Sequence, residues 1–86
     1  MIDVIYLPSF IRQYEKLDKA LQDEVDDKID LFINGFNNQS LKTHKLHGRL
    51  KDRWSFSVNY KVRIVFKYVS KKEAAFLAIG DHDIYN

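Results

Sequence analysis

Residues 53–68 constrain the fold more than any other part of the chain, because apolar and polar side chains alternate there almost without a break. The even positions hold Trp54, Phe56, Val58, Tyr60, Val62, Ile64, Phe66 and Tyr68. An alternation of period two is typical of β-strands that bury one face. The two halves of this set can share a face only if a hairpin pairs residues of equal parity, such as Val58 with Val62. Ser57 would then lie opposite Arg63.

The last predicted strand differs, because residues 74–79 are apolar at every position. Such a run is expected of a strand that is covered on both sides or nearly so. We therefore place it centrally in the sheet. Strand parity groups His82, just beyond this run, with Phe76, Ala78 and Gly80.

Helices are predicted in the first half of the chain, after a strand at residues 2–7 that Pro8 ends. The first helix begins at Pro8 and carries an apolar stripe of Phe10, Tyr14 and Leu17. Asp18 is a candidate N-cap for a second helix, which Asn34 and the glycine after it end. The apolar face of that helix holds Leu21, Val25, Ile29, Phe32 and Phe36. Its opposite face holds Asp23, Asp26, Asp27 and Asp30.

The predicted order of elements is therefore β-α-α-β-β-β, an α+β fold in which the two amphipathic helices form a hairpin. Residues 36–52 show no clear periodicity and are long for a loop, so we expect a functional segment there. A chain of 86 residues is too short to divide its core, and residues 1–86 are expected to form a single domain.

Several classes of protein are excluded by composition. The chain has no cysteine, so it holds no disulfide, thiol nucleophile or thiolate zinc site. Its longest apolar run, residues 74–79, is far shorter than the roughly 20 residues that span a bilayer. The N-terminus lacks the basic start of a signal peptide. We expect a cytoplasmic protein without a membrane partner.

The charge is distributed very unevenly along the chain, although the net charge is only +2. Residues 1–40 carry four basic and eight acidic side chains, a net charge of −4. Residues 42–72 carry ten Lys and Arg against one Asp, a net charge of +9. A basic segment of this kind attracts polyanions, of which phosphate backbones are the commonest in the cytosol. A solvated, solubilising surface is the alternative.

Arg63 and His82 are the strongest candidates for chemistry. If the side of the last strand that carries His82 is the polar one, the two residues lie together over a floor made shallow by Ala78 and Gly80. A guanidinium beside a histidine suits a phosphodiester, because one clamps the phosphate while the other transfers a proton. Metal-free RNA cleavage by attack of the ribose 2′-OH is therefore conceivable.

Simpler roles stay open for the same residues. His82 could pair with a neighbouring aspartate, and Arg63 could be a surface residue. His44 and His47 are spaced like a metal pair, but lysines surround them and no third ligand is near. We expect no metal and no other cofactor. Tyr85 could stack on a base or cover the edge of the core.

Five stretches of the sequence resemble the RelE/ParE superfamily of type II toxin–antitoxin toxins, and within it the YafQ and RelE/StbE branches. They are F-x-x-x-Y-x-K-L at 10–17, H-K-L-H-G at 44–48, R-W-S-F-S-V at 53–58, Y-K-V-R-I-V-F-K-Y at 60–68 and I-G-D-H-D-I-Y at 79–85. Their order and spacing carry the resemblance over nearly the whole chain. It implies a small twisted, mainly antiparallel sheet with a helical hairpin packed on one face.

The resemblance also implies an activity: ribosome-dependent, metal-free cleavage of translated mRNA in the A site, neutralised by a cognate antitoxin. Arg63 matches the family's strand arginine at the scissile phosphate, and His82 matches its terminal acid or base. His44 falls where YafQ-like members keep a histidine, and Tyr85 is near the aromatic residue that ends many members. Contacts to the phosphates of mRNA or of RNA in the 70S ribosome are expected from Lys45, His47, Arg49, Lys51, Arg53 and Lys61.

Two positions depart from the family pattern. Ala78 is near the position at which several RelE-like toxins place a second arginine on the last strand. Ser57 is at the position where YafQ-like toxins carry a further histidine. The superfamily also contains ParE-like DNA gyrase inhibitors and non-catalytic relatives, so a gyrase poison and an inactive RNA-binding protein are the alternatives. The cationic surface independently favours a partner with an acidic or amphipathic segment that folds on binding.

Overall fold

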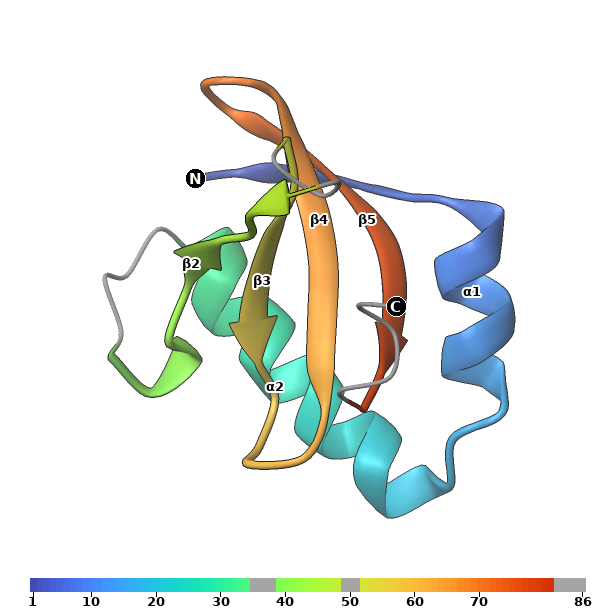
Figure 1. Cartoon of the computed structure of the whole chain (residues 1–86). Helices are drawn as coiled ribbons and strands as arrows, with labels where there is room; N and C mark the ends of the chain where they lie inside the picture. The colour runs from blue at the N-terminus through green and yellow to red at the C-terminus, as the bar shows by residue number, and fades with distance from the viewer. Residues whose placement is uncertain (35–38, 49–51, 82–86) are drawn as a thin grey trace.

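The computed structural model describes residues 1–34, 39–48 and 52–81, and it has two layers (Figure 1). One layer is a five-stranded sheet of order β1-β5-β4-β3-β2, parallel at β1–β5 and antiparallel elsewhere. The other consists of two helices, of which α2 crosses behind the sheet in Figure 1 and α1 lies along β5. The elements are β1 (Asp3–Tyr6), α1 (Pro8–Glu15), α2 (Lys19–Ile33), a short 3-10 helix η1 (Gln39–Leu41), β2 (His44–Lys45), β3 (Trp54–Ser57), β4 (Arg63–Ser70) and β5 (Glu73–Gly80). The predicted α+β architecture is confirmed.

The β3–β4 hairpin has the register that the alternation predicts. Ser57 pairs with Arg63, and the Val58 amide donates to the Val62 carbonyl at 2.9 Å. Asn59 shapes the turn, because its Oδ1 accepts from the amides of Lys61 at 2.9 Å and Val62 at 2.8 Å. Such side-chain bonds to the backbone two or three residues on are the reason asparagine is common in turns.

The parity predicted for the last strand is wrong at Phe76, and a bulge is the reason. Val65 pairs with Ala78 but Phe66 pairs with Phe76, so Leu77 is an extra residue on β5. Phe76 therefore turns toward the helices, while Ala78 stays on the opposite side of the sheet. As predicted, β5 is an interior strand, between β1 and β4.

Polar side chains of α1 hold the bulged part of β5. The Ser9 hydroxyl donates to the Leu77 carbonyl at 2.6 Å, and the Gln13 Oε1 accepts from the Ile79 amide at 2.8 Å. Buried backbone groups that leave the ladder need such partners, because an unpaired one is costly. The first helix thus fixes the direction in which β5 runs toward the end of the chain.

Phenylalanines fill the space between the sheet and the helices. The ring of Phe32 on α2 lies 4.9 Å from those of Phe56 and Phe66 and 5.6 Å from that of Phe76. Phe10 on α1 approaches Phe76 to 5.4 Å. Burying a ring of this size contributes about 1.5–3 kcal/mol. This cluster makes the two helices and the sheet one packing unit.

The ends of the helices follow the sequence signals. Pro8 opens α1, and the Asp18 side chain caps α2 by accepting from the Leu21 amide at 2.8 Å. Asn34 ends α2, donating through Nδ2 to the Asp30 carbonyl at 2.8 Å. Phe36 lies outside the described residues. No helix in the described part of the chain is long and apolar enough to cross a membrane.

The segment predicted as a loop, residues 36–52, contains more structure than its sequence indicates. It holds η1 and the two-residue strand β2, which pairs with β3. Leu41 and Leu46 anchor it, since both are buried. Two leucines five residues apart are too few to produce a period, which is why the sequence alone predicts a loop.

Candidate functional site

The candidate site lies on the face of the sheet that the helices leave uncovered, which we call the Arg63 face. Strand pairing aligns Ser57, Arg63 and Gly80 in one row across β3, β4 and β5. The next row holds His44, Ser55, Val65 and Ala78, on β2 to β5. Arg63 is therefore flanked across the sheet by two small residues, Ser57 and Gly80.

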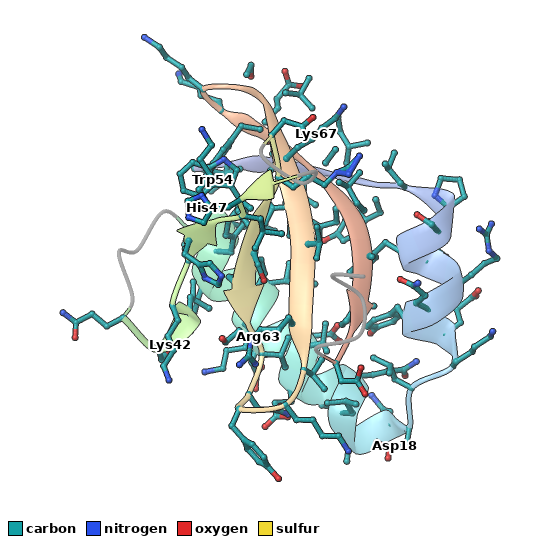
Figure 2. All side chains as sticks on the ribbon, in the orientation of Figure 1. Asp18, Lys42, His47, Trp54, Arg63 and Lys67 are labelled. Atoms are coloured by element: carbon teal, nitrogen blue, oxygen red, sulfur yellow. The ribbon has the colours of Figure 1, made fainter. Side chains whose placement is uncertain are left out.

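Arg63 is half-buried at the start of β4, and the β3–β4 turn holds its guanidinium (Figure 2). Its Nη1 donates to the Asn59 carbonyl at 2.6 Å and to the Val62 carbonyl at 3.3 Å. Within the described part of the chain, the other two guanidinium nitrogens have no partner. An arginine has five donors in a rigid fork, so these nitrogens remain for a phosphate oxygen.

His44 shares this face, because it pairs with Ser55 on β3. It is exposed, and its Nδ1 lies 2.9 Å from the Lys42 carbonyl oxygen. A carbonyl only accepts, so Nδ1 carries the proton and Nε2 is the basic nitrogen. Two strand spacings and one two-residue step put the Cα atoms of His44 and Arg63 roughly 12 Å apart. A bound nucleotide could span that gap.

His82 and Tyr85 lie outside the described residues, and so do Arg49 and Lys51. The structure therefore describes the site up to Asp81. Gly80, two residues before His82, pairs with Arg63. The bulge at Leu77 is what keeps this end of β5 in register with Arg63.

The other predicted RNA-binding residues are scattered. His47 and Lys61 are exposed, His47 after β2 and Lys61 in the β3–β4 turn. Lys45 is exposed too, but it pairs with Trp54, so it points to the side opposite His44. Arg53 is half-buried, and its buried Nε has no hydrogen-bond partner among the residues described. The structure brings His44, but not Lys45, to the Arg63 face.

Sequence reasoning missed Lys67 as a site residue. It is exposed and pairs with Ala75, and it lies on the Arg63 face four residues along β4, roughly 13 Å from Arg63 (Figure 2). The available signal was that Lys67, like Arg63, has an odd number in the alternating segment and so belongs to the same face of the strand. A second cation along β4 suits an RNA backbone, whose phosphates recur along the strand.

Charges of opposite sign separate between the two layers. Five exposed acidic residues lie on α2, whereas Arg63 and Lys67 lie on β4 and Lys61 lies in the turn before it. In residues 1–34, 39–48 and 52–81, no three His, Asp or Glu side chains gather closely enough to hold a metal ion. A phosphate on the Arg63 face would therefore meet arginine, lysine and histidine.

The solved structures to which this chain is similar share its fold end to end. YafQ of E. coli strain BL21(DE3) matches with a TM-score of 0.81 at 18% sequence identity, covering 99% of this chain and 98% of that one. This chain has the YafQ fold. The YoeB/ParE toxin from Agrobacterium tumefaciens matches with a TM-score of 0.76 at 18% identity, over 94% of this chain and 99% of the other.

A third match is the E. coli DinJ-YafQ toxin–antitoxin complex, with a TM-score of 0.77 at 20% identity over 96% of this chain and 94% of the other. No family model and no curated protein matches the sequence. The resemblance that the sequence motifs indicate is thus confirmed for the fold.

Proposed function

We propose that this chain is the toxin of a type II toxin–antitoxin module and that it cleaves translated mRNA as a metal-free, ribosome-dependent endoribonuclease. The observation that carries the proposal is the setting of Arg63 in a YafQ fold. Its guanidinium is oriented by two turn carbonyls, and its neighbours across the sheet, Ser57 and Gly80, are small. A phosphodiester can approach such an arginine without displacing a large side chain.

In this reaction the 2′ oxygen of a ribose attacks the adjacent phosphorus, and the bond to the 5′ oxygen of the next nucleotide breaks. The products are a 2′,3′-cyclic phosphate and a 5′-hydroxyl end. Arg63 would stabilise the charge that develops on the phosphate oxygens in the transition state. Its two nitrogens without a partner among the described residues would donate to that group while Nη1 stays bonded to the turn.

Proton transfer needs a base for the 2′-OH and an acid for the 5′ oxygen. We assign one role to His82, which follows the strand position that pairs with Arg63, and consider His44 for the other. The exposed Nε2 of His44 suits a base, because Nδ1 is bound to a carbonyl. Tyr85 would stack on a nucleobase of the RNA or position the phosphate. Lys67 and Lys61, with the basic residues of 42–53, would bind RNA phosphates of the message and the ribosome.

The partner that we propose for control is a cognate antitoxin. The E. coli DinJ-YafQ and Staphylococcus aureus YoeB-YefM structures are named as such complexes, and both contain a chain of this fold. An antitoxin segment with acidic side chains would suit the Arg63 face, since that face is cationic. Cleavage would stop because the segment occupies the place of the phosphates.

Induced expression in cells tests this proposal against the gyrase alternative. Wild type is compared with Arg63→Ala and with Arg12→Ala, a matched control that removes the same charge from α1, on the other layer. We expect mRNA cleavage before growth stops in wild type and in the control. In Arg63→Ala we expect the rate of mRNA cleavage to fall about 10²- to 10⁴-fold. DNA breaks that precede any loss of mRNA would favour a gyrase poison. Toxicity that persists unchanged in Arg63→Ala would overturn the proposed site.

A further inference from the structure

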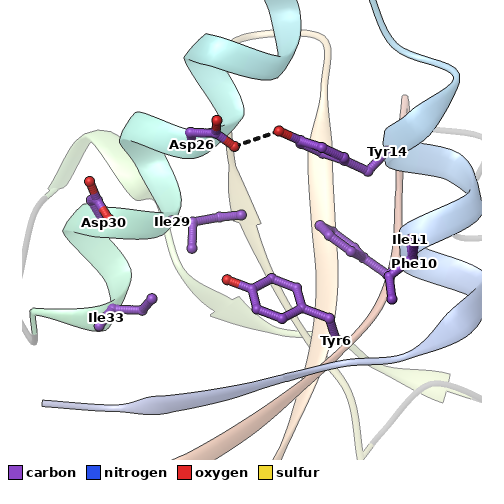
Figure 3. Close-up of a pocket in the computed structure, with 8 residues that line it drawn as sticks. All are labelled: Tyr6, Phe10, Ile11, Tyr14, Asp26, Ile29, Asp30 and Ile33. Carbon is purple, nitrogen blue, oxygen red and sulfur yellow. Dashed lines mark hydrogen bonds between the residues drawn. The ribbon is translucent and has the colours of Figure 1, made fainter.

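A groove on the helical side of the molecule lies away from the Arg63 face. It is a cavity of about 470 Å³ between α1 and α2, open to solvent and closed at its base by Phe10 and Ile29 (Figure 3). Tyr6 points into it from β1 toward α2. Tyr6 and Ile11 are 43% and 42% exposed, which leaves an apolar surface at the mouth of the groove. The volume lies within the range of about 300–1,000 Å³ that is usual for binding pockets.

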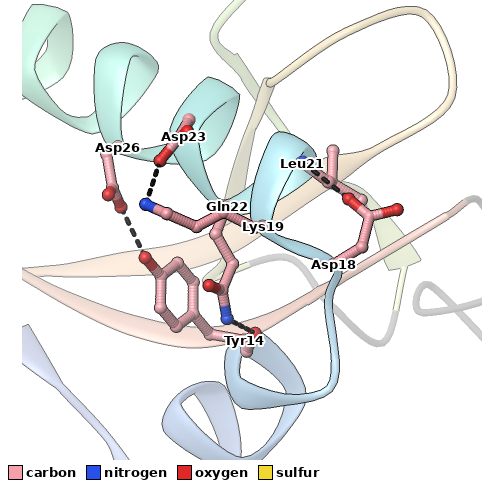
Figure 4. A network of polar contacts seen from close by, with 7 residues as sticks. All are labelled: Tyr14, Asp18, Lys19, Leu21, Gln22, Asp23 and Asp26. Carbon is pink, nitrogen blue, oxygen red and sulfur yellow. Dashed lines mark hydrogen bonds and ion pairs between the residues drawn. The ribbon is translucent and has the colours of Figure 1, made fainter.

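Polar contacts join the two helices beside the groove. The Tyr14 hydroxyl donates to an Asp26 carboxylate oxygen at 2.7 Å, and Gln22 Nε2 donates to the Tyr14 carbonyl at 3.0 Å (Figure 4). The Asp26 carboxylate raises the pKa of Tyr14 to about 12. Burial, with Asp26 and Asp30, also raises the pKa of Tyr6. Both phenols therefore stay neutral, and the two carboxylates give the rim its charge.

Asp26 and Asp30 are four residues apart, so they stand one helical turn apart on the same side of α2, about 6 Å from each other. Lys19 makes its ion pair with Asp23 at 2.6 Å, and Asp26 attracts the same ammonium group from a greater distance. In the portion of the chain that the structure describes, Asp30 has no ion-pair partner. The rim thus presents a row of negative charge beside an apolar cavity.

We propose that this groove docks an amphipathic helix of a partner protein, with apolar side chains between α1 and α2 and Lys or Arg side chains facing Asp26 and Asp30. A helix places such cations one turn apart, which matches the spacing of the two carboxylates. An acidic segment is repelled here, whereas the Arg63 face attracts it. The inference does not depend on the ribonuclease reaction, since no residue of the groove belongs to the candidate site.

A second copy of this chain fits the groove less well. Among the residues that the structure describes, the most exposed aromatic is Tyr60, at 87%, which stands beside Lys61 on the hairpin turn. That turn offers one ring and one cation, where the groove presents several apolar side chains and two carboxylates.

A displayed library of helical peptides, each about 16 residues or roughly four turns long, tests the proposal on the full chain. We expect the selected peptides to combine apolar residues at helical spacing with Lys or Arg four residues apart. Amide NMR shifts should map them to Tyr6, Ile11 and α2. Their affinity should fall about tenfold in Asp30→Lys and stay within about twofold in Asp27→Lys, an equal charge change on a residue that does not line the groove.

Ile11→Ser provides a second test, because it removes apolar contact at the mouth without changing charge. It should also weaken the selected peptides about tenfold. Thermal unfolding of each variant checks that the fold is intact. The proposal is overturned if the library yields only acidic peptides that map to the Arg63 face, or no peptide at all. It is equally overturned if Asp27→Lys weakens binding as much as Asp30→Lys, or if the groove is filled by self-association that Tyr60→Ser abolishes.

Discussion

Replacing Asn59 by alanine should separate the orientation of Arg63 from its chemistry. Asn59 accepts from the amides of Lys61 and Val62 and donates through Nδ2 to a Glu24 carboxylate oxygen on α2 at 2.7 Å. Its own carbonyl accepts from Arg63 at 2.6 Å. The alanine variant keeps this carbonyl but loses the side-chain bonds that fix the turn. Arg63 would then gain conformational freedom.

The expected loss of stability follows from the bonds removed. Each of the two backbone amides loses a bond with a net worth of about 0.5–1.5 kcal/mol, and the exposed contact to Glu24 adds little. We expect about 1–3 kcal/mol in all, which lowers the Tm of a domain of this size by roughly 4–24 °C. Immobilising a long side chain costs about 1–2 kcal/mol, so an untethered Arg63 should slow cleavage by roughly 5- to 30-fold.

Two assays on the same preparations measure these effects: thermal unfolding by circular dichroism, and single-turnover mRNA cleavage well below the Tm. Glu24→Ala is the matched control, because it removes only the exposed contact on α2 and leaves both amide bonds to the Asn59 Oδ1 in place. It should cleave within about twofold of wild type. A lowered Tm with an unchanged cleavage rate in Asn59→Ala would refute the claim that the turn orients Arg63 for cleavage. An unchanged Tm would refute the account of the turn.

Three further predictions test the fold, the RNA surface and the groove. Phe76→Ala should destabilise the chain by about 3–5 kcal/mol, measured by urea unfolding, because its ring is fully buried among other phenylalanines; a cost below 1 kcal/mol would contradict the packing. Lys67→Ala should weaken RNA binding for all sequences alike and lower the slope of log K against log salt by about 1, whereas an unchanged slope would remove Lys67 from the interface. The Tyr14 phenol, with its pKa raised to about 12, should contribute stability below pH 10 that is lost as the pH rises through 12, and an ultraviolet titration in which this phenol ionises near pH 10 would contradict the bond to Asp26.

The hairpin could be predicted from the sequence because its information is local. The parity of residues 53–68 fixes which side chains share a face, and one register satisfies it. Ser57 opposite Arg63 follows directly, and the structure has this pair. The Asp18 cap is equally local, since it depends on an amide three residues away.

The bulge in β5 could not be predicted, because every position in residues 74–79 is apolar and alternation carries no signal there. Its position depends on distant partners, Ser9 and Gln13 on α1, and on the room for Phe76 among the core rings. The sequence therefore predicts the face of Ala78 correctly, but it places Phe76 on the Arg63 face instead of the face that the helices cover.

The short strand β2 and the groove are also beyond sequence reasoning. Two residues are too few for a period, and β2 forms because β3 offers an edge to pair with. The groove depends on the angle between α1 and α2, which tertiary packing sets. The acidic face of α2 is visible in the sequence, but its position beside Tyr6 and Ile11 is not.

The most direct test of the central claim is to map mRNA 5′ ends in a purified translation system with wild type and His82→Ala. The account predicts cuts within codons in the ribosomal A site for wild type, each leaving a 5′-hydroxyl, and none without ribosomes. The His82→Ala variant should cut about 10²- to 10⁴-fold more slowly while retaining the wild-type Tm. Intact mRNA with wild type under these conditions would contradict the assignment of this chain as a ribonuclease.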